Sequence, residues 1–446
     1  MAFTTDKQTL EDLNLLGKFR KNSVYSLFDR TRTRVGRQRL EAMFRQPLCD
    51  AEAINARSAG FRYFAGTGVV FPFDGEQIDE AGSYMDASAE GGGFAVACGI
   101  LAAKARQLFA SDRGYEKMQD GLRALLRTVA GTADLLRKVS DAHSPVRERC
   151  LRFFAVFDDA ALDRIRRAAG QERFTLAETI RWGRYFRSAC REAVGEMLQL
   201  LYDLDLWLSV ASAARECGFG YAEALPAGER KLEIGGVRHP ALAKAVANDV
   251  SIDADRNVFF LTGVNMAGKS TFMKSVATAV YLAHMGFPVA ARSMRFSLLD
   301  GVYTSINVPD DIEQGYSHFY AEVLRVKHIA EQVSAGRNLL VVFDELFKGT
   351  NVKDAYDATL AVTTAFSAYR NCKFIISTHI IEVGPALSER CGNVQFHYFP
   401  SELDGTRPVY RYLLAEGISN DRHGMTIINN ERILETIRGE AAETEI

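Results

Sequence analysis

The sequence has none of the features that mark a membrane span, a secretory signal or a disulfide framework. Its longest apolar run, residues 94–103, ends at Lys104 and falls short of the ~18 residues that a membrane-spanning helix needs. The N-terminal segment has neither the basic stretch nor the apolar stretch of a secretory signal. The 7 cysteines are scattered without a Cys-x-x-Cys pair, which indicates reduced thiols and no zinc site. We therefore expect a cytoplasmic protein that does not contact a membrane.

The chain also lacks the overall positive charge that would attract nucleic acid. It carries 54 Lys and Arg residues against 56 Asp and Glu residues, a net charge of −2. Any nucleic-acid surface must therefore be local. At 446 residues the chain is too long for one compact core, and we expect two or three domains.

The two halves of the sequence differ in their apolar pattern. Residues 9–221 read as almost wholly helical, because apolar residues recur at spacings of three and four. Beyond residue 228, short apolar or β-branched runs alternate with helical stretches, which is typical of a largely parallel sheet with helices on both faces. These runs occupy residues 231–234, 258–262, 339–343 and 374–377. We predict an α + α/β chain with a helical domain at residues 1–227 and an α/β domain at residues 228–446.

A phosphate-binding loop follows the run at residues 258–262. The pattern G-x4-G-K-[ST] lies between an expected strand and an expected helix, as a P-loop requires. Glycines let backbone N–H groups approach phosphate oxygens, Lys269 reaches the β- and γ-phosphates, and the Ser270 hydroxyl ligates Mg²⁺. The alternative is a flexible glycine loop without a ligand. The predicted ATP-binding residues are Thr262, Gly263, Asn265, Met266, Ala267, Gly268, Lys269, Ser270 and Thr271.

Two carboxylates, Asp344 and Glu345, follow the run at residues 339–343. An acidic pair after a strand is common at helix N-termini, but behind a P-loop it indicates that Asp344 holds Mg²⁺ and that Glu345 polarises the attacking water. His379 follows the next run, and a histidine there could sense the γ-phosphate. The alternative is a histidine that is only hydrogen-bonded within a loop.

Four segments, taken in order, carry a resemblance to a known family. Residues 262–271 (TGVNMAGKST) are similar to TGPNMGGKST, and residues 344–351 (DELFKGTN) to DELGRGTS. Residues 310–322 (DDIEQGYSHFYAE) follow D-D-I-x-x-G-x-S-x-F-x-x-E, and residues 377–379 (STH) resemble ATH. Upstream, residues 238–240 (RHP) and Asn248-Asp249 stand where this family has RHP and ND. The chain resembles the MutS family of DNA mismatch repair ATPases.

This resemblance implies an ATPase, using ATP and Mg²⁺, that drives dimer and DNA-clamping rearrangements in DNA repair or recombination. Residues 1–227 would be a helical core and lever domain with a reduced clamp, and residues 228–446 the ATPase domain. In a homodimer, Ser317 would reach the γ-phosphate held by the other subunit, His379 would be a switch residue, and Asn265 would orient water or phosphate. From the residues alone, Ser317 could equally cap the helix that follows it.

The sequence also departs from the family pattern. Val264 and Ala267 replace a proline and a glycine of the loop, and Phe347 and Lys348 replace Gly-Arg. The chain begins at the core domain, so we expect a shortened member without the mismatch-recognition and connector domains. Mismatch recognition itself is therefore not expected.

Arginines near aromatic residues form the main candidate for contact with DNA. They are Arg164, Arg166, Arg167, Arg173, Arg181, Arg184 and Arg187, beside Phe174, Trp182, Tyr185 and Phe186. Such residues contact phosphates without reading sequence. Acidic residues are interleaved with them, so the alternative is a solvated, ion-paired helix face.

Two functions remain open from the sequence. The first is a MutS-like ATPase whose partners are DNA, a second copy of itself and other repair proteins. The second is an ATP-gated interaction or assembly module of the P-loop class, which uses its helical half to hold a protein. An ABC-type ATPase is disfavoured because the sequence has no LSGGQ-like signature.

Overall fold

The computed structural model describes residues 2–17, 23–87, 92–110, 112–264, 266–307, 318–404, 407–419 and 433–438. The chain forms two compact units. The sheet unit contains Met1–Leu27, Gln46–Ser58 and Cys217–Ile446, and the helical unit contains Phe28–Arg45 and Ala59–Glu216. The sequence-based boundary near residue 228 divides the chain once, whereas the sheet unit is assembled from three separate stretches. Composition cannot detect short helical segments whose partners lie hundreds of residues away.

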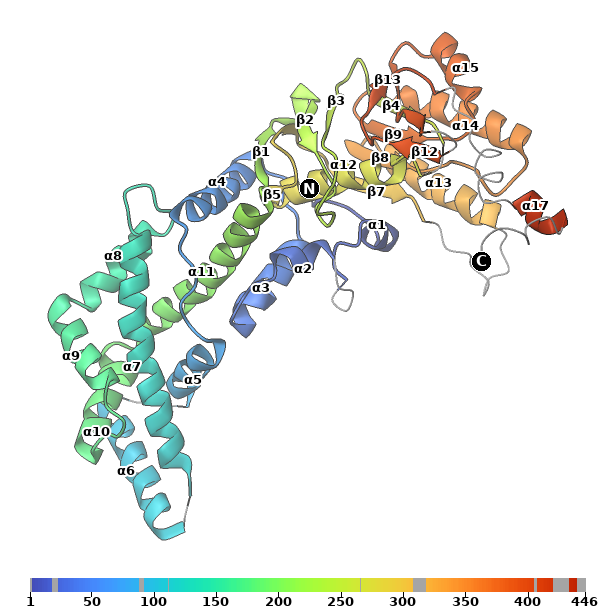
Figure 1. Ribbon diagram of the computed structural model, residues 1–446. Coiled ribbons are helices and arrows are strands. Elements are labelled where there is room, and N and C mark those ends of the chain that lie inside the picture. The colour runs from blue at the N-terminus through green and yellow to red at the C-terminus, as the bar shows by residue number, and fades with distance from the viewer. Residues whose placement is uncertain are drawn as a thin grey trace. The chain divides into compact units, whose positions relative to one another are not determined.

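Six strands form the main sheet of the sheet unit, in the order β13–β10–β4–β9–β8–β7 (Figure 1). The inner strands are β4 (Val258–Thr262), β9 (Lys373–Ser377) and β8 (Leu339–Phe343), followed by β7 (Gly301–Ser305). These strands and β10 (Val394–Tyr398) are parallel, and only the edge strand β13 (Ala415–Glu416) pairs antiparallel. Every residue of β4, β7, β8 and β9 is buried. Burial on both faces explains why these strands appear in the sequence as continuous apolar runs.

Helices cover both faces of the main sheet. On one face, α13 (His318–Ser334), α14 (Val352–Ser367) and α15 (Val383–Arg390) pack over the strands, with Ile329, Leu360 and Leu387 in a common apolar cluster (Figure 1). On the other face, α12 (Lys269–His284) contacts β7 and β8 of the main sheet and also strands of a second sheet. Helix α12 is therefore buried on almost every side, as a helix that is apolar all round must be.

The second sheet is a departure from the sequence-based prediction. Its strand order is β3–β2–β6–β1–β5, and only the β1–β6 pair is parallel. The expected strand at residues 231–234 belongs here, within β2, and not in the parallel sheet; its pattern of alternating burial is that of a strand packed mainly on one face. The strands are β1 (Gly220–Leu225), β2 (Leu232–Val237), β3 (Asn248–Ile252), β5 (Pro288–Val289) and β6 (Ser293–Ser297), with the 3₁₀ turn η2 (Ala227–Glu229). Strands β11 (Ser401–Asp404) and β12 (Arg407–Tyr410) form a separate hairpin, and α17 (Ile433–Arg438) follows.

The N-terminal residues complete the free edge of the main sheet. Thr4 bridges to Gly301 in β7, and α1 (Lys7–Asp12) packs on the same strand. The buried carboxylate of Asp12 accepts hydrogen bonds from the Thr304 hydroxyl (2.6 Å) and from the backbone N–H of Ile306 (3.0 Å). These bonds satisfy polar groups within β7 and just beyond its end, which explains why the first residues belong to the sheet unit.

Helices are the only regular elements among the described residues of the helical unit, which confirms the predicted helical character of residues 28–45 and 59–216. The longest are α7 (Gly114–Val139) and α11 (Arg191–Cys217), which share one apolar core with residues such as Leu125 and Leu201. The others are α3 (Arg34–Arg45), α5 (Gly75–Asp86), α6 (Gly93–Ala110), α8 (Arg147–Val156), α9 (Asp159–Ala169), α10 (Leu176–Arg184) and the π-helix η1 (Tyr185–Ala189). Helices α2 (Val24–Phe28) and α4 (Ala51–Thr67) have residues in both units.

A buried carboxylate fixes the start of α3. Asp205 of α11 is 1% exposed and accepts hydrogen bonds from the N–H of Arg32 (2.9 Å), the N–H of Thr33 (2.8 Å) and the Thr33 hydroxyl (2.7 Å). A Cβ atom on Gly36 would lie 2.5 Å from Oδ2 of Asp205, so only glycine permits this approach. The carboxylate therefore positions Thr33, whose hydroxyl caps α3 by accepting a hydrogen bond from the N–H of Gly36 (2.9 Å).

Helix α6 differs from the expectation that no segment could span a membrane. It continues past Lys104 to Ala110, and by length and composition it is the one helix among the described residues apolar enough to cross a bilayer. Its Val96, Ile100 and Ala103 pack in a small core with Tyr115 of α7, while Phe94 and Phe109 are exposed. One such helix is weak evidence for a membrane span, since core helices of soluble domains pass the same test.

Candidate functional site

The loop between β4 and α12 has the backbone that a phosphate cradle needs. Gly263 (φ 128°) and Gly268 (φ 106°) both adopt conformations that side chains disfavour. At Gly268 a Cβ atom would also lie 3.0 Å from Cδ1 of Tyr412, so the position lacks space as well. The loop then enters α12 directly, and the N-terminus of that helix favours an anion.

Lys269 is buried at the first position of α12. It is 4% exposed, and its ammonium donates hydrogen bonds to the carbonyl oxygens of Gly263 (2.7 Å) and Val264 (3.0 Å). Burial lowers the pKa of Lys269, an effect opposed by the nearby carboxylates of Glu345 and Asp344. No carboxylate of the described residues lies within ion-pairing distance of Nζ. An ammonium carries three donors, so this one has capacity left for an anion.

Asp344 and Glu345 follow β8. Hydrogen bonds with Ser377, the last residue of β9, hold both in place. The Ser377 hydroxyl donates to Oδ1 of Asp344 (2.6 Å), while the backbone N–H of Glu345 donates to the Ser377 carbonyl and hydroxyl oxygens (3.1 Å each). Glu345 has a left-handed backbone (φ 55°), which is strained for a non-glycine residue and is found mainly at functional sites. Ser377 thus orients the acidic pair, a role that no sequence motif indicates.

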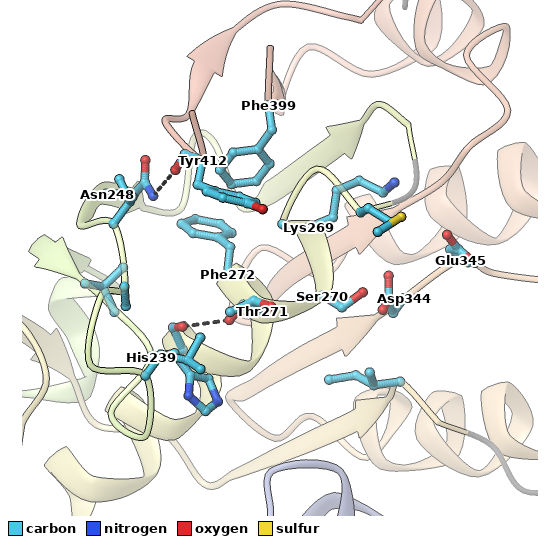
Figure 2. A pocket seen from close by; sticks show the side chains of 18 of the residues that line it. His239, Asn248, Lys269, Ser270, Thr271, Phe272, Asp344, Glu345, Phe399 and Tyr412 are labelled. Atoms are coloured by element: carbon cyan, nitrogen blue, oxygen red, sulfur yellow. Dashed lines mark hydrogen bonds between the residues drawn. The ribbon is translucent and has the colours of Figure 1, made fainter. Parts of the chain in front are cut away.

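These elements border one cavity of about 610 Å³ (Figure 2). Of the predicted residues, the cavity brings together Met266, Gly268, Lys269, Ser270, Thr271, Asp344 and Glu345. Figure 2 shows Ser270, Asp344 and Glu345 on one side of it. The volume lies within the range of pockets that hold a small-molecule ligand.

Other predicted residues lie elsewhere. Thr262 and Ala267 are buried beneath the loop, and Oγ1 of Thr262 accepts a hydrogen bond from the N–H of Ser419 (2.9 Å). His379 is exposed after β9 and is not among the described residues that line the cavity. Asn265 and Ser317 lie outside the described residues.

An aromatic side of the cavity was not found from the sequence. The rings of Phe272, Phe399 and Tyr412 gather opposite the acidic pair in Figure 2. Asn248 fixes this side: its amide donates to the Tyr412 carbonyl (3.0 Å), and its side-chain oxygen accepts from the N–H of Leu414 (2.7 Å). Asn248 stands out in the sequence only through the family resemblance, and nothing in the sequence marks Tyr412.

Two further lysines line the same cavity, Lys244 and Lys348. Lys348 is one of the two residues that replace Gly-Arg in the family pattern, so the departure still places a cation beside the acidic pair. His239 also lines the cavity, and burial lowers its pKa, which favours the neutral ring.

The donor set would suit Mg²⁺ bound together with a nucleotide, because Mg²⁺ is usually held by one or two protein oxygens together with substrate phosphates. Ser270 and Asp344 supply a hydroxyl and a carboxylate on the same cavity as Lys269. No group of three or more His, Cys, Asp or Glu side chains that could hold a metal exists among the described residues. All 7 cysteines are free thiols.

A central parallel strand, a glycine loop, a helix with a buried lysine at its start and an acidic pair on a nearby strand define a P-loop nucleotide-binding domain. Residues 259–445 match the family model described as MutS domain V, and residues 8–67 match MutS domain III. The chain belongs to the MutS family.

Curated relatives agree with this assignment. The chain is 29% identical over 238 residues to the DNA mismatch repair protein MutS of Brevibacillus brevis, covering 52% of this chain and 27% of the relative. It is 36% identical over 188 residues to the protein of the same name from Symbiobacterium thermophilum (41% and 21%). For the Geobacillus kaustophilus protein of that name the identity is 31% over 240 residues (52% and 26%). The chain therefore spans about a quarter of the length of these relatives.

Proposed function

We propose that the sheet unit binds ATP and hydrolyses it with Mg²⁺. The observation that carries the proposal is the buried ammonium of Lys269, whose hydrogen-bond partners among the described residues are two backbone carbonyls of its own loop, on a cavity that also contains Ser270, Asp344 and Glu345. A buried cation without a carboxylate partner is costly unless an anion joins it. A triphosphate is the anion whose size and charge suit this cavity.

Each residue has a distinct role in this proposal. Lys269 and the loop N–H groups contact phosphate oxygens, with Thr262, Gly263 and Ala267 shaping the loop and Met266 and Thr271 bordering it. Asn265 orients water or phosphate. Ser270 and Asp344 would hold Mg²⁺, which when bound supplies positive charge beside the phosphates. Glu345 orients water and accepts its proton. The aromatic side formed by Phe272, Phe399 and Tyr412 would receive the base.

We further propose that the hydrolysis serves DNA repair or recombination in the cytoplasm, with DNA, other repair proteins and a second copy of the chain as partners. Family membership and the names of the relatives support this wider role. Within it, Ser317 acts across the dimer and His379 senses the γ-phosphate. The exposed position of His379 leaves its side chain available to a bound nucleotide or to the second copy.

Release of phosphate from ATP in the presence of Mg²⁺ tests the proposal. We expect Lys269→Ala to abolish hydrolysis and to weaken ATP binding, because it removes the fixed charge nearest the transferred phosphoryl group. Lys373→Ala is the matched control: Lys373 is also buried, 3% exposed, but does not line the cavity. Lys269→Ala turning over ATP at the wild-type rate would overturn the assignment.

Sedimentation of the wild type with and without ATP and Mg²⁺ checks the dimer, and full activity from a monomer would exclude the role of Ser317.

A further inference from the structure

The helical unit has a cavity of its own, of about 540 Å³, between α9 and α10. Three arginines border it: Arg164 and Arg167 from α9, and Arg181 from α10. Trp182 and Tyr185 line it as well. Neither of the segments matched by the family models, residues 8–67 and 259–445, includes these helices.

The acidic residues interleaved with these arginines are engaged elsewhere. Asp158 caps α9 through the N–H of Ala161, and Asp159 pairs with Arg137 (2.8 Å). Asp163 pairs with Arg166 (3.7 Å), and Glu178 closes a capping box with Thr175 at the start of α10. None of these carboxylates forms an ion pair with an arginine of the cavity; hydrogen bonds with Thr175 and, less strongly, the charge of Arg181 lower the pKa of Glu178.

Within the described part of the chain, Arg164, Arg167 and Arg181 have no carboxylate within 4 Å. Arg167 donates only to the backbone carbonyl of Asp163 (3.2 Å), and Arg181 lies over the Trp182 ring, 5.4 Å from its centroid. Three positive charges therefore border one hollow, and none of them is in an ion pair among the described residues. An anion bound there would meet all three.

Two other arginines of the same cluster have structural roles. Arg187 is 5% exposed, donates to the Tyr84 carbonyl and lies 3.7 Å from the centroid of the Tyr84 ring. Arg166 pairs with Asp134 (2.7 Å) and with Asp163. Arg164, Arg167 and Arg181 thus have charge available for a ligand. The charges of Arg166 and Arg187 are already paired or buried.

The cavity also has an aromatic wall. The Trp182 ring is stacked on Phe186, with centroids 5.7 Å apart and planes 17° apart, which fixes its position. Tyr185 is half-buried and begins the π-helix η1, where the extra residue per turn changes the direction of the following side chains. π-Helical turns are rare in proteins, and those that occur are often found at functional sites. Nε1 of Trp182 is buried and has no hydrogen-bond partner among the described residues.

We propose that this cavity binds a nucleotide unit, with the phosphate held by Arg164, Arg167 and Arg181 and the base placed against Tyr185. Arginine clusters recognise phosphate, and aromatic side chains beside them provide the surface on which an unpaired base stacks. The bases of a duplex are already stacked and paired, so the unit comes from single-stranded nucleic acid or from a free nucleotide. This site is separate from the P-loop and does not depend on ATP hydrolysis.

Fluorescence anisotropy of a labelled single-stranded oligonucleotide, without ATP and at several salt concentrations, tests the proposal. Arg164→Ala, Arg167→Ala and Arg181→Ala combined should weaken binding at least tenfold and reduce the slope of log affinity against log salt by about 0.7, since the three arginines hold one phosphate and each phosphate neutralised on a single strand contributes roughly that amount. The control combines Arg123→Ala, Arg137→Ala and Arg166→Ala, which changes the net charge equally but removes ion-paired arginines. The control should remain within about twofold of the wild type.

Two additional arms identify the source of the ligand. Unlabelled duplex of the same length should compete more weakly than single strand, and competition by a mononucleotide as strong as that of the single strand would assign the site to free nucleotides. Lys269→Ala should bind the oligonucleotide as the wild type does, which distinguishes this site from the P-loop. Equal losses in the two triple variants, or retained binding when the three cavity arginines are removed, would overturn the proposal. Trp182 emission in a Trp207→Phe background gives a second readout, and no change on saturation would also contradict it.

Discussion

The two ends of helix α12 bury a titratable side chain in opposite ways. At the N-terminal end, the Lys269 ammonium has two backbone carbonyls as partners and borders a cavity. At the C-terminal end, His284 is fully buried and both ring nitrogens are used: Nδ1 donates to the Leu48 carbonyl (3.0 Å), and Nε2 accepts from the N–H of Leu299 (3.3 Å). Phe3 and Phe296 pack on its ring.

This difference separates a binding site from a structural polar group. The hydrogen bonds of His284 define a neutral ring with its proton on Nδ1, and burial lowers its pKa to about 4. Both ring nitrogens of His284 are therefore occupied and cannot bind a ligand. Lys269 keeps its charge and a donor that has no hydrogen-bond partner among the described residues, so it can still bind an anion. Burial alone therefore does not mark function, whereas incomplete satisfaction beside a cavity does.

The largest expected effect is on the rate of ATP turnover, at the acidic pair near Lys269. Glu345→Gln should lower the rate of ATP turnover on the order of 10²-fold or more while leaving ATP affinity close to the wild-type value, because Glu345 acts on water and not on nucleotide. Calorimetric ATP binding and phosphate release measure the two quantities. Glu389→Gln, an exposed acid on α15, is the control. Equal losses of affinity and rate would assign a structural role to the pair.

A smaller, purely structural effect is expected at His284. Its pKa of about 4 in the folded chain lies below the usual 6.5, so between these pH values the unfolded chain binds a proton that the folded chain does not. The stability contribution is therefore complete above pH 6.5 and is lost as the pH falls towards 4, by up to about 3 kcal/mol.

Urea unfolding at pH 7, 5.5 and 4.5 measures this contribution. His284→Asn should be less stable at pH 7 but should lose less stability on acidification than the wild type does. Its ATP turnover per folded molecule should match the wild type. Identical pH dependence in the two proteins would show that His284 is not the titrating group.

The smallest effect is expected at the aromatic side of the cavity. Tyr412→Ala should weaken ATP binding about tenfold, since stacking of a base on an aromatic ring contributes roughly 1–3 kcal/mol. Tyr412→Phe keeps the ring and should bind ATP nearly as the wild type does. If the phenylalanine variant binds as weakly as the alanine variant, the hydroxyl and not the ring makes the contact. Unchanged ATP affinity in both variants would show that the base does not bind against Tyr412.

The sequence was most informative where function depends on adjacent residues. The loop from Gly263 to Thr271 requires glycines, a lysine and a hydroxyl at fixed spacing, and Asp344-Glu345 follows a strand that is buried on both faces and is therefore visible as an apolar run. Residues brought in from afar were missed. Asn248 and Tyr412 are 164 positions apart, and Ser377 and Asp344 are 33 apart, so no local pattern predicts either hydrogen bond.

The second sheet was missed for a related reason. Its strands β1 and β2 are short, alternate in burial and both pair with β6, which lies far along the chain beyond α12, so the sequence pattern places residues 231–234 in the parallel sheet. The N-terminal segment looked like part of the helical half because α1 is a helix. It belongs to the sheet unit because Thr4 and Asp12 bond to β7 and to the residues that follow it.

The sequence by itself determined the phosphate loop, the acidic pair and the helical character of residues 28–216, because backbone conformation and side-chain periodicity are local properties. It also showed a cluster of arginines interleaved with acids, without deciding which were paired. Only the tertiary structure decided that Arg166 meets Asp134 of α7 while Arg164, Arg167 and Arg181 border a cavity without a carboxylate. An ion pair forms between atoms within about 4 Å, and for residues on different helices that distance is set by how the helices pack.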